Sequence, residues 1–224
     1  MKITWLGQAG LLFETGGLSI VIDPYLSNSC QRLNPASFRR VPVKERFLQI
    51  RPDVIICTHN HQDHYDEETL EHYLMGEKAV TCLVAPSCFE PIRKYGVRHN
   101  YIWFAPHTRW TERGVRFFSV RAVHSDPEAI GVLIEAEGKS YYITGDTLYN
   151  TDIFEDIPKN LEAVFLPVNG LGNNMNLFDA ADFAGRINAK KTVPLHMGML
   201  DDFCLADFSA PNAVIPEIYK EIQL

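Results

Sequence analysis

The chain has 224 residues, of which 46% are hydrophobic and 22% are charged, and its formal net charge at pH 7 is -7. This composition is ordinary for a globular protein and excludes the disordered, collagen-like and coiled-coil classes. The acidic balance argues against nucleic acid or an anionic membrane held by a general basic surface. We therefore expect one domain over residues 1–224, without a nucleic-acid or membrane partner.

Cysteine usage and the N-terminal residues bear on the cellular compartment. The five cysteines are widely spaced and form no C-x-x-C pair, which is typical of reduced thiols rather than of a disulfide framework or a zinc ribbon. The first residues lack the basic region and continuous apolar core of a signal peptide, and no apolar run approaches the about 18 residues of a spanning helix. We expect a cytoplasmic protein, whose oligomeric state the sequence leaves open.

Short apolar runs separated by glycines open the chain and predict antiparallel strands over residues 3–6, 11–13 and 18–22. The third run ends at Asp23-Pro24, and a residue that precedes proline is expected to be extended. Asp23 would then stand at a strand end, where a carboxylate can orient a histidine ligand. A turn-forming role for Asp23 is an equally good interpretation.

Residues 25–50 have no hydrophobic period and contain a cluster of arginine and lysine side chains. A connection of this length in a compact domain is usually functional or disordered. We predict that Arg39 and Arg40 offer cations to an anionic substrate. A charged loop that simply faces water is the alternative, and the pattern does not decide whether the loop covers the site.

A cluster of metal-ligating residues follows the apolar run 54–57: His59, His61, Asp63 and His64 lie within six positions. Imidazoles and a carboxylate at a buried strand end need partners, because taking them out of water is costly. A metal ion satisfies all of them at once. Adjacent ligands cannot all point at one ion, so we expect a turn that divides them between two ions about 3.5–4 Å apart.

Further along the chain, the patterns predict a helix from residue 66, a strand over 81–85, a helix over 86–95 and a strand over 101–104. Antiparallel strands are expected over 115–123, 131–136 and 140–144; a strand over 161–166, a helix from Asn176 to about residue 187, a strand over 192–195 and a closing helix over 213–222 follow. Each half begins with antiparallel strands and passes into strand-helix alternation. The expected fold class is α/β (α+β type), a four-layer αββα sandwich of two mixed β-sheets flanked by helices.

Three further strand ends carry ligand-type residues, namely His124, Asp146 and His196. Each alone would more often be a satisfied structural residue, but their recurrence after apolar runs favours a shared site. Asparagines also crowd a loop after the strand at 161–166. We predict that Asn174 hydrogen-bonds a polar substrate, although turn chemistry explains such asparagines nearly as well.

The order of these motifs, H-x-H-x-D-H, a distant His, Asp in a T-G-D turn and a last His, resembles the metallo-β-lactamase-fold hydrolase superfamily. Segments 5–10, 22–27 and 172–176 are similar to its ascorbate-6-phosphate lactonase-like branch. The resemblance implies the following ligands: His59, His61 and His124 for one ion, Asp63, His64 and His196 for the other, and Asp146 as the bridge. Antibiotic-hydrolysing relatives typically have Cys at the position of Asp146, and diiron oxygen-reducing relatives typically have Glu at that of His61, so neither activity is expected.

The predicted function is that of a metal-dependent hydrolase, in which dinuclear metal-bound hydroxide cleaves a lactone, ester or phosphodiester bond of a small anionic substrate. Asp63 and Asp146 are the predicted catalytic residues, Asp63 because a carboxylate oxygen free of metal can move a proton. Two divalent ions are expected; the ligands suit zinc, manganese, iron or nickel, and the resemblance favours zinc or manganese. The alternatives are a nuclease of the superfamily and a non-catalytic metal-binding sensor or interaction protein.

Overall fold

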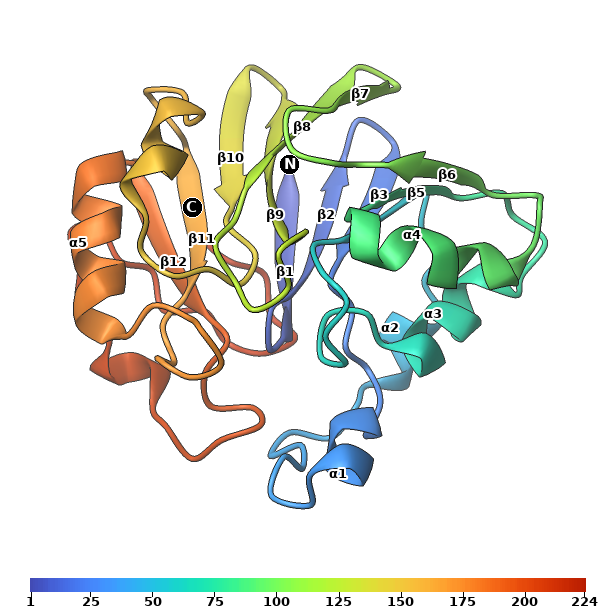
Figure 1. The fold of residues 1–224 in the computed structure, drawn as a ribbon, viewed down its shortest axis with the longest axis horizontal. Coiled ribbons are helices and arrows are strands. Elements are labelled where there is room, and N and C mark those ends of the chain that lie inside the picture. Colours follow the sequence, from blue (N-terminus) through green and yellow to red (C-terminus); the bar gives the residue numbers. More distant parts are fainter.

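The computed structural model describes residues 1–224 and contains two six-stranded mixed sheets (Figure 1). The first sheet, in spatial order, consists of β1 (Lys2–Gly7), β2 (Gly10–Thr15), β3 (Leu18–Ile22), β4 (Val54–Cys57), β5 (Thr81–Val84) and β6 (Asn100–Trp103). The second consists of β12 (Lys191–Leu195), β11 (Ala163–Pro167), β10 (Lys139–Ile143), β9 (Ile130–Ala136), β8 (Val115–Arg121) and β7 (Arg109–Glu112).

The two halves of the chain repeat one plan, as the sequence predicted. In the first sheet β1, β2 and β3 are antiparallel and β3 to β6 are parallel. In the second sheet β7 to β10 are antiparallel and β10 to β12 are parallel. Tight turns with positive φ make the hairpins, at Gly16-Gly17 between β2 and β3 and at Glu137-Gly138 between β9 and β10. Such turns match the right-handed twist of the paired strands.

This topology brings the ends of distant strands to one edge of the molecule. Since β1 and β3 both pair antiparallel with β2, they run in the same direction, and β4 is parallel to β3. By the same reasoning β8, β10, β11 and β12 share a direction in the second sheet. The carboxyl ends of these strands carry the histidines and aspartates that the sequence singled out.

Helices cover parts of the outer faces and confirm the expected fold class. Figure 1 shows α3 (Glu67–Leu74) and α4 (Pro86–Ile92) beside the first sheet, and α5 (Leu177–Ile187) beside β11 and β12 of the second. The start of α5 is the one predicted: the side-chain oxygen of Asn176 accepts hydrogen bonds from the backbone N–H groups of Phe178 and Asp179. Such a cap typically contributes about 1 kcal/mol to helix stability.

One hydrophobic core of 60 buried residues runs through both sheets. Phe13 of β2 joins the two layers, because its ring contacts Tyr141 of β10 and Phe165 of β11 edge-on, with centroids 6.0 and 5.9 Å apart. Each such aromatic pair typically contributes about 0.5–1.5 kcal/mol beyond the burial of its area. The core therefore fixes the relative position of the strand ends on which the site depends.

The predicted closing helix over 213–222 is wrong, because this segment closes the sheets at their exposed edges instead. Ala213 bridges Thr192 of β12, and Glu221 bridges Thr4 of β1. Pro216 lies inside the predicted helix, where it would remove a hydrogen-bond donor and clash with the preceding turn. The edge strands β1 and β12 offer unpaired backbone N–H and C=O groups. The backbone of the segment forms hydrogen bonds with them instead of forming a helix.

Two other parts of the chain contain more regular structure than the sequence predicted. Residues 25–50 contain two short helices, α1 (Ser29–Leu33) and α2 (Glu45–Leu48), and the edge strand β7 was not predicted. The remaining elements are three 3-10 helices at Arg93–Tyr95, Thr151–Glu155 and Leu205–Asp207. None of the helices combines the length and the hydrophobicity needed to cross a membrane.

Candidate metal centre

The seven residues predicted as metal ligands lie together where the carboxyl ends of the two sheets meet. They come from the ends of β4, β8, β10 and β12. Candidate ligand atoms approach within 4.8 Å of one another in three groups: His59, His61 and His124; His59, His64 and Asp146; and Asp63, His64 and His196. The structure thus brings together, in space, the two triads that the sequence resemblance implied, with Asp146 beside both.

In the first triad the imidazole nitrogens converge because their opposite nitrogens are already engaged. His61 Nε2 lies 3.4 Å from Ser125 Oγ, and His124 Nδ1 lies 3.2 Å from the carbonyl oxygen of Asn173, to which it can donate. The other nitrogens of these two rings, His61 Nδ1 and His124 Nε2, face each other at 3.1 Å. His59 Nδ1 lies 3.1 Å from Thr58 Oγ1, whereas His59 Nε2 is buried without a hydrogen-bond partner. These contacts leave one nitrogen of each ring free for a shared ligand.

In the second triad two imidazoles and a carboxylate meet. His196 Nε2 lies 3.1 Å from Asp63 Oδ2 and 3.1 Å from His64 Nε2. Asp146 Oδ2 lies 3.1 Å from His196 Nε2 and 4.0 Å from His124 Nε2, and Asp146 Oδ1 lies 3.3 Å from His64 Nε2. Asp146 therefore contacts members of both triads, which is the position that a bridging carboxylate requires.

Asp23 is not itself a candidate ligand, but its side chain orients two histidines that are. Its carboxylate accepts hydrogen bonds from the Thr58 backbone N–H at 2.8 Å, from Thr58 Oγ1 at 2.6 Å and from His64 Nδ1 at 2.8 Å. Because the Thr58 hydroxyl donates to Asp23, its oxygen is left to accept from His59 Nδ1. One carboxylate thus sets which ring nitrogen of His59 and of His64 points toward the other candidate ligands.

The backbone of Asp23 corrects an expectation from the sequence. Its φ is +43°, in the left-handed region, and not extended as its position before Pro24 predicted. Three hydrogen bonds hold its side chain, and they outweigh the local preference. Gln8, Asn173 and His196 also have positive φ values, of +49°, +65° and +63°. Four of the eleven non-glycine residues with a positive φ therefore lie at the site.

Gly145 shows why a glycine precedes Asp146. Its φ is +62°, and a Cβ atom there would lie 2.6 Å from the carbonyl oxygen of Ile130 and 3.1 Å from Cβ of Thr58. No other residue fits this position without moving the backbone of β9 or the loop after β4. The T-G-D turn can therefore bring Asp146 close to the histidine cluster.

Buried charges shift the protonation equilibria of the site. Burial alone lowers the pKa of His196, but Asp146 and Asp63 outweigh it and raise the pKa of His196 to about 10. The pKa of His64 is raised in the same way, against burial, chiefly by Asp146. Conversely, burial raises the pKa of Asp146, but His196 and His64 outweigh it and hold the pKa well below the usual range.

In the first triad the pKa values of two histidines are shifted in the opposite direction. Burial is the main cause that lowers the pKa of His59 well below its ordinary value, and burial also lowers the pKa of His124. Neutral imidazoles are the form in which histidine binds metal ions. The two triads thus differ: burial favours the neutral forms of His59 and His124 in the first, whereas the second balances carboxylates against protonated imidazoles.

The residues present fit divalent metal ions. His59 Nε2 and Asp146 Oδ1 are both buried and make no hydrogen bond within the protein, although such atoms are nearly always partnered. Both atoms belong to a set of imidazole nitrogens and carboxylate oxygens, which suits zinc, manganese, iron or nickel. A metal ion would satisfy these atoms and would neutralise the carboxylates of Asp23, Asp63 and Asp146.

The sequence of this chain matches a family of known proteins. Residues 2–196, a range that includes all seven candidate ligands, match the family described as the beta-lactamase superfamily domain. The chain belongs to the beta-lactamase superfamily. A UPF0173 metal-dependent hydrolase of Saccharolobus solfataricus is 30% identical to it over 210 residues, which cover 89% of this chain and 86% of that relative.

Solved structures share the fold of this superfamily member. Igni18, described as a metallo hydrolase from Ignicoccus hospitalis, is 19% identical, with a TM-score of 0.76 over 98% of this chain and 96% of that one. The metallo-beta-lactamase fold protein YhfI from Bacillus subtilis is 17% identical, with a TM-score of 0.75 over 100% and 99%. The metallo-β-lactamase fold expected from the sequence is confirmed, while the resemblance to the lactonase-like branch stays a prediction.

The arginines predicted to contact substrate are engaged elsewhere in this superfamily member. Arg39 donates to the carbonyl oxygen of Tyr25 at 2.7 Å and to the hydroxyl of Tyr219 at 2.7 Å. Arg40 donates to the carbonyl oxygens of Phe38 and Leu200, and it pairs with Asp202 at 3.1 Å. These partners belong to the segment 25–50 and to the C-terminal loops, and none is a candidate ligand.

Asn174 does lie at the centre, but against a candidate ligand. Its side-chain nitrogen donates to Asp146 Oδ2 at 2.8 Å, and its side-chain oxygen is buried without a partner. Asn173 on the same loop presents its carbonyl oxygen to His124 Nδ1. The asparagine-rich loop thus supports His124 of the first triad and Asp146, which lies between the triads.

Sequence reasoning assigned no role to Gln8 or Thr58, although both touch candidate ligands. Gln8 follows β1, and Thr58 directly precedes His59. The topology contained the evidence that could have identified Gln8: β1 runs parallel to β3, so its carboxyl end lies at the same edge as Asp23. Thr58 could have been identified only from its hydroxyl being next to the first histidine.

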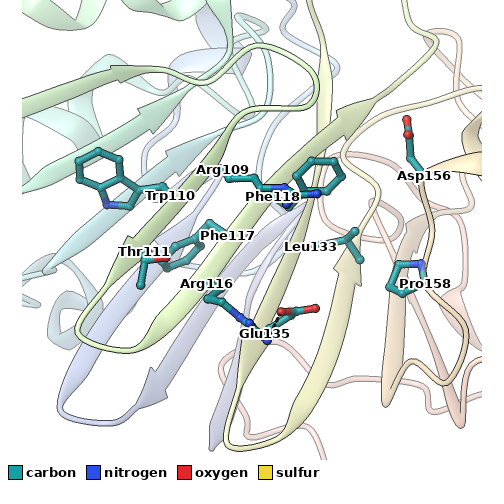
Figure 2. Close-up of a pocket in the computed structure, with 10 residues that line it drawn as sticks. All are labelled: Arg109, Trp110, Thr111, Arg116, Phe117, Phe118, Leu133, Glu135, Asp156 and Pro158. Atoms are coloured by element: carbon teal, nitrogen blue, oxygen red, sulfur yellow. Dashed lines mark ion pairs between the residues drawn. The ribbon is translucent and has the colours of Figure 1, made fainter.

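A separate cavity of about 390 Å³ lies on the outer face of β7, β8 and β9 (Figure 2). It is lined by half-exposed aromatic side chains, including Trp110 and Phe118, and by Arg109, Arg116 and Glu135. The dashed line in Figure 2 marks the ion pair between Arg116 and Glu135, at 2.7 Å. None of the seven candidate ligands lines this cavity, so we do not assign it to the metal centre.

Proposed function

We propose that this chain is a metal-dependent hydrolase with a dinuclear centre, which cleaves a lactone, ester or phosphodiester bond of a small anionic molecule. One observation carries the proposal: two triads of imidazole and carboxylate ligands meet with Asp146 in contact with both. Membership of the beta-lactamase superfamily and a relative named a metal-dependent hydrolase support it.

His59, His61 and His124 would hold one ion, Asp63, His64 and His196 the second, and Asp146 would join them. When bound, two divalent ions lower the pKa of water and polarise the oxygen of the bond to be cleaved. We propose zinc or manganese, with iron and nickel as further candidates. Because Arg39 and Arg40 donate to other groups, the preference for an anionic substrate would come from the ions themselves.

Asp63 is the residue that we propose to move the proton. The contacts of its carboxylate with Gln8, His64 and His196 all involve Oδ2, so Oδ1 is available. Its side chain is also the more accessible of the two acidic candidate ligands, 19% exposed against 5% for Asp146. Asp63 Oδ1 can therefore take a proton from the attacking water and return it to the leaving group.

The proposal is tested by replacing one ligand and measuring ions and activity together. In His61→Ala we expect loss of metal and loss of hydrolysis of the same substrate, found with a panel of lactones, esters and phosphodiesters. His107→Ala is the matched control, because His107 is exposed and pairs with Asp156 away from the centre. Full activity of a metal-free His61→Ala protein would overturn the mechanism.

A further inference from the structure

Gln8 lies between two residues of the second triad, and it is 97% buried, with 3% of its surface exposed. Its side-chain nitrogen donates to Asp63 Oδ2 at 2.8 Å. The same nitrogen lies 3.2 Å from each ring nitrogen of His196. Because the two distances are equal, the amide packs against the imidazole ring rather than donating to one nitrogen of it.

The chemistry of the carboxylate decides how the amide is turned. An ionised carboxylate only accepts hydrogen bonds, so the NH₂ group of Gln8 faces Asp63. The Gln8 side-chain oxygen is consequently buried without a partner. A buried amide oxygen without a donor costs free energy. The Gln8 amide nitrogen nevertheless faces Asp63, although this orientation leaves the amide oxygen without a hydrogen bond.

The backbone of Gln8 is held as firmly as its side chain. Its carbonyl oxygen accepts hydrogen bonds from Trp5 Nε1 at 2.9 Å and from the backbone N–H of His196 at 3.1 Å. Its φ of +49° is unfavourable for a residue with a side chain. Through one residue, therefore, the end of β1 fixes both the backbone of His196 and the carboxylate of Asp63.

We propose that Gln8 is a positioning residue for the second ion, which holds Asp63 and His196 in the geometry that binds it. The contacts of its amide group are with members of that triad, Asp63 and His196, and not with His59, His61 or His124. Loss of the amide should consequently weaken the second ion and leave the first in place. This inference rests on the proposed dinuclear centre.

The experiment titrates metal-free wild type, Gln8→Met and Gln8→Asn with cobalt(II), following the absorption bands and counting bound ions by elemental analysis. Methionine keeps the length of glutamine without its donor, and asparagine keeps the amide but is too short to reach Asp63. Gln49→Met is the matched control, because the exposed side chain of Gln49 makes no hydrogen bond. Circular dichroism checks that each variant is folded.

We expect two ions in wild type and in Gln49→Met, and in both Gln8 variants one tightly bound ion and a second bound about 10–100-fold more weakly, the range typical of lost outer-sphere partners. Excess metal should restore much of kcat in the Gln8 variants, whereas general misfolding would not be reversed. Two ions with wild-type affinities in both Gln8 variants would overturn the inference alone, and so would equal loss of both ions. Absence of ions from wild type would overturn the proposed function and this inference with it.

Discussion

The candidate metal centre and the outer cavity on β7, β8 and β9 both contain histidine or arginine beside acidic residues. The two regions differ in how deeply these residues are buried and in whether each polar atom has a partner. In the cavity and at its rim two ion pairs are partly exposed to water: Arg116 with Glu135 at 2.7 Å, and His107 with Asp156 at 2.9 Å. In the centre, the side chains of His64 and Asp23 are fully buried, and His59 Nε2 has no partner. Buried imidazole and carboxylate atoms without a hydrogen-bond partner, rather than the volume of a cavity, identify the site.

The energetic difference between the two regions is large. Exposed ion pairs typically contribute about 0–1 kcal/mol, because water screens them and their side chains lose entropy. Removing one partner from a buried charge network typically costs about 3–5 kcal/mol. A chain that keeps buried carboxylates, unpartnered polar atoms and four left-handed residues at one site does so against its own stability. Such sites are usually functional.

The largest expected effect is on the buried network that Asp23 organises. Asp23→Ala removes the acceptor of Thr58 N–H, Thr58 Oγ1 and His64 Nδ1. We expect the free energy of unfolding of the metal-free protein to fall by about 3–5 kcal/mol, measured by urea denaturation. A loss below about 1 kcal/mol would show that this network is no more important to stability than a surface pair.

The stability of the metal-free protein should depend on pH through His196 of the candidate metal centre. In the metal-free protein the pKa of His196 is raised to about 10, so the stability from its contacts is fully present below the unfolded value of about 6.5 and is lost as the pH rises through 10. We expect the melting temperature of the metal-free protein to fall between about pH 7 and pH 10.

Metal-loaded protein is the control, because bound ions replace these protons and should remove most of this decrease. An identical pH profile with and without metal would contradict the assignment of His196 to the centre.

A pair of glycines tests the close packing at the centre with the backbone alone. Gly138 and Gly145 have φ values of +74° and +62°, but a Cβ at Gly138 meets nothing within 4 Å, whereas at Gly145 it would meet the Ile130 carbonyl oxygen at 2.6 Å. Both alanine variants carry the strain of positive φ, about 1–2 kcal/mol. The free energy of unfolding of Gly145→Ala should fall by about 1–3 kcal/mol more than that of Gly138→Ala, because the added methyl group is overpacked. Gly145→Ala should also bind metal poorly, as elemental analysis would show. Equal losses would show that the contact is relieved easily.

The smallest effect is expected in the outer cavity. Arg116→Ala removes an ion pair whose side chains are 70% and 39% exposed. We expect the free energy of unfolding to change by no more than about 0.5 kcal/mol, with metal content and activity unchanged. Lost hydrolytic activity in a stable, metal-loaded Arg116→Ala protein would show that this face takes part in the reaction after all.

The sequence predicted most of the fold and the clustering of the site, because both depend on strand order. Once antiparallel and parallel runs are recognised, the carboxyl ends of β4, β8, β10 and β12 must come to one edge, and His59 to His64, His124, Asp146 and His196 come with them. The roles of these seven residues as ligands remain a proposal. Their proximity follows from topology.

Features set by long-range contacts were not predictable in this way. The left-handed φ of Asp23 depends on donors 35 and 41 positions away, at Thr58 and His64. The course of residues 213–222 depends on the unpaired edges of β1 and β12, which Glu221 and Ala213 bridge. Charge patterns alone did not show that Arg40 donates to the carbonyl oxygen of Leu200, 160 positions along the chain.

The central claim is that each of the two triads holds one metal ion, and it is tested most directly by counting the ions. Elemental analysis of protein purified without added metal, repeated after loading with zinc or manganese, gives the number of ions per chain. We expect about two ions per loaded chain, and fewer in His61→Ala. A folded, loaded wild-type protein that binds none would contradict the account.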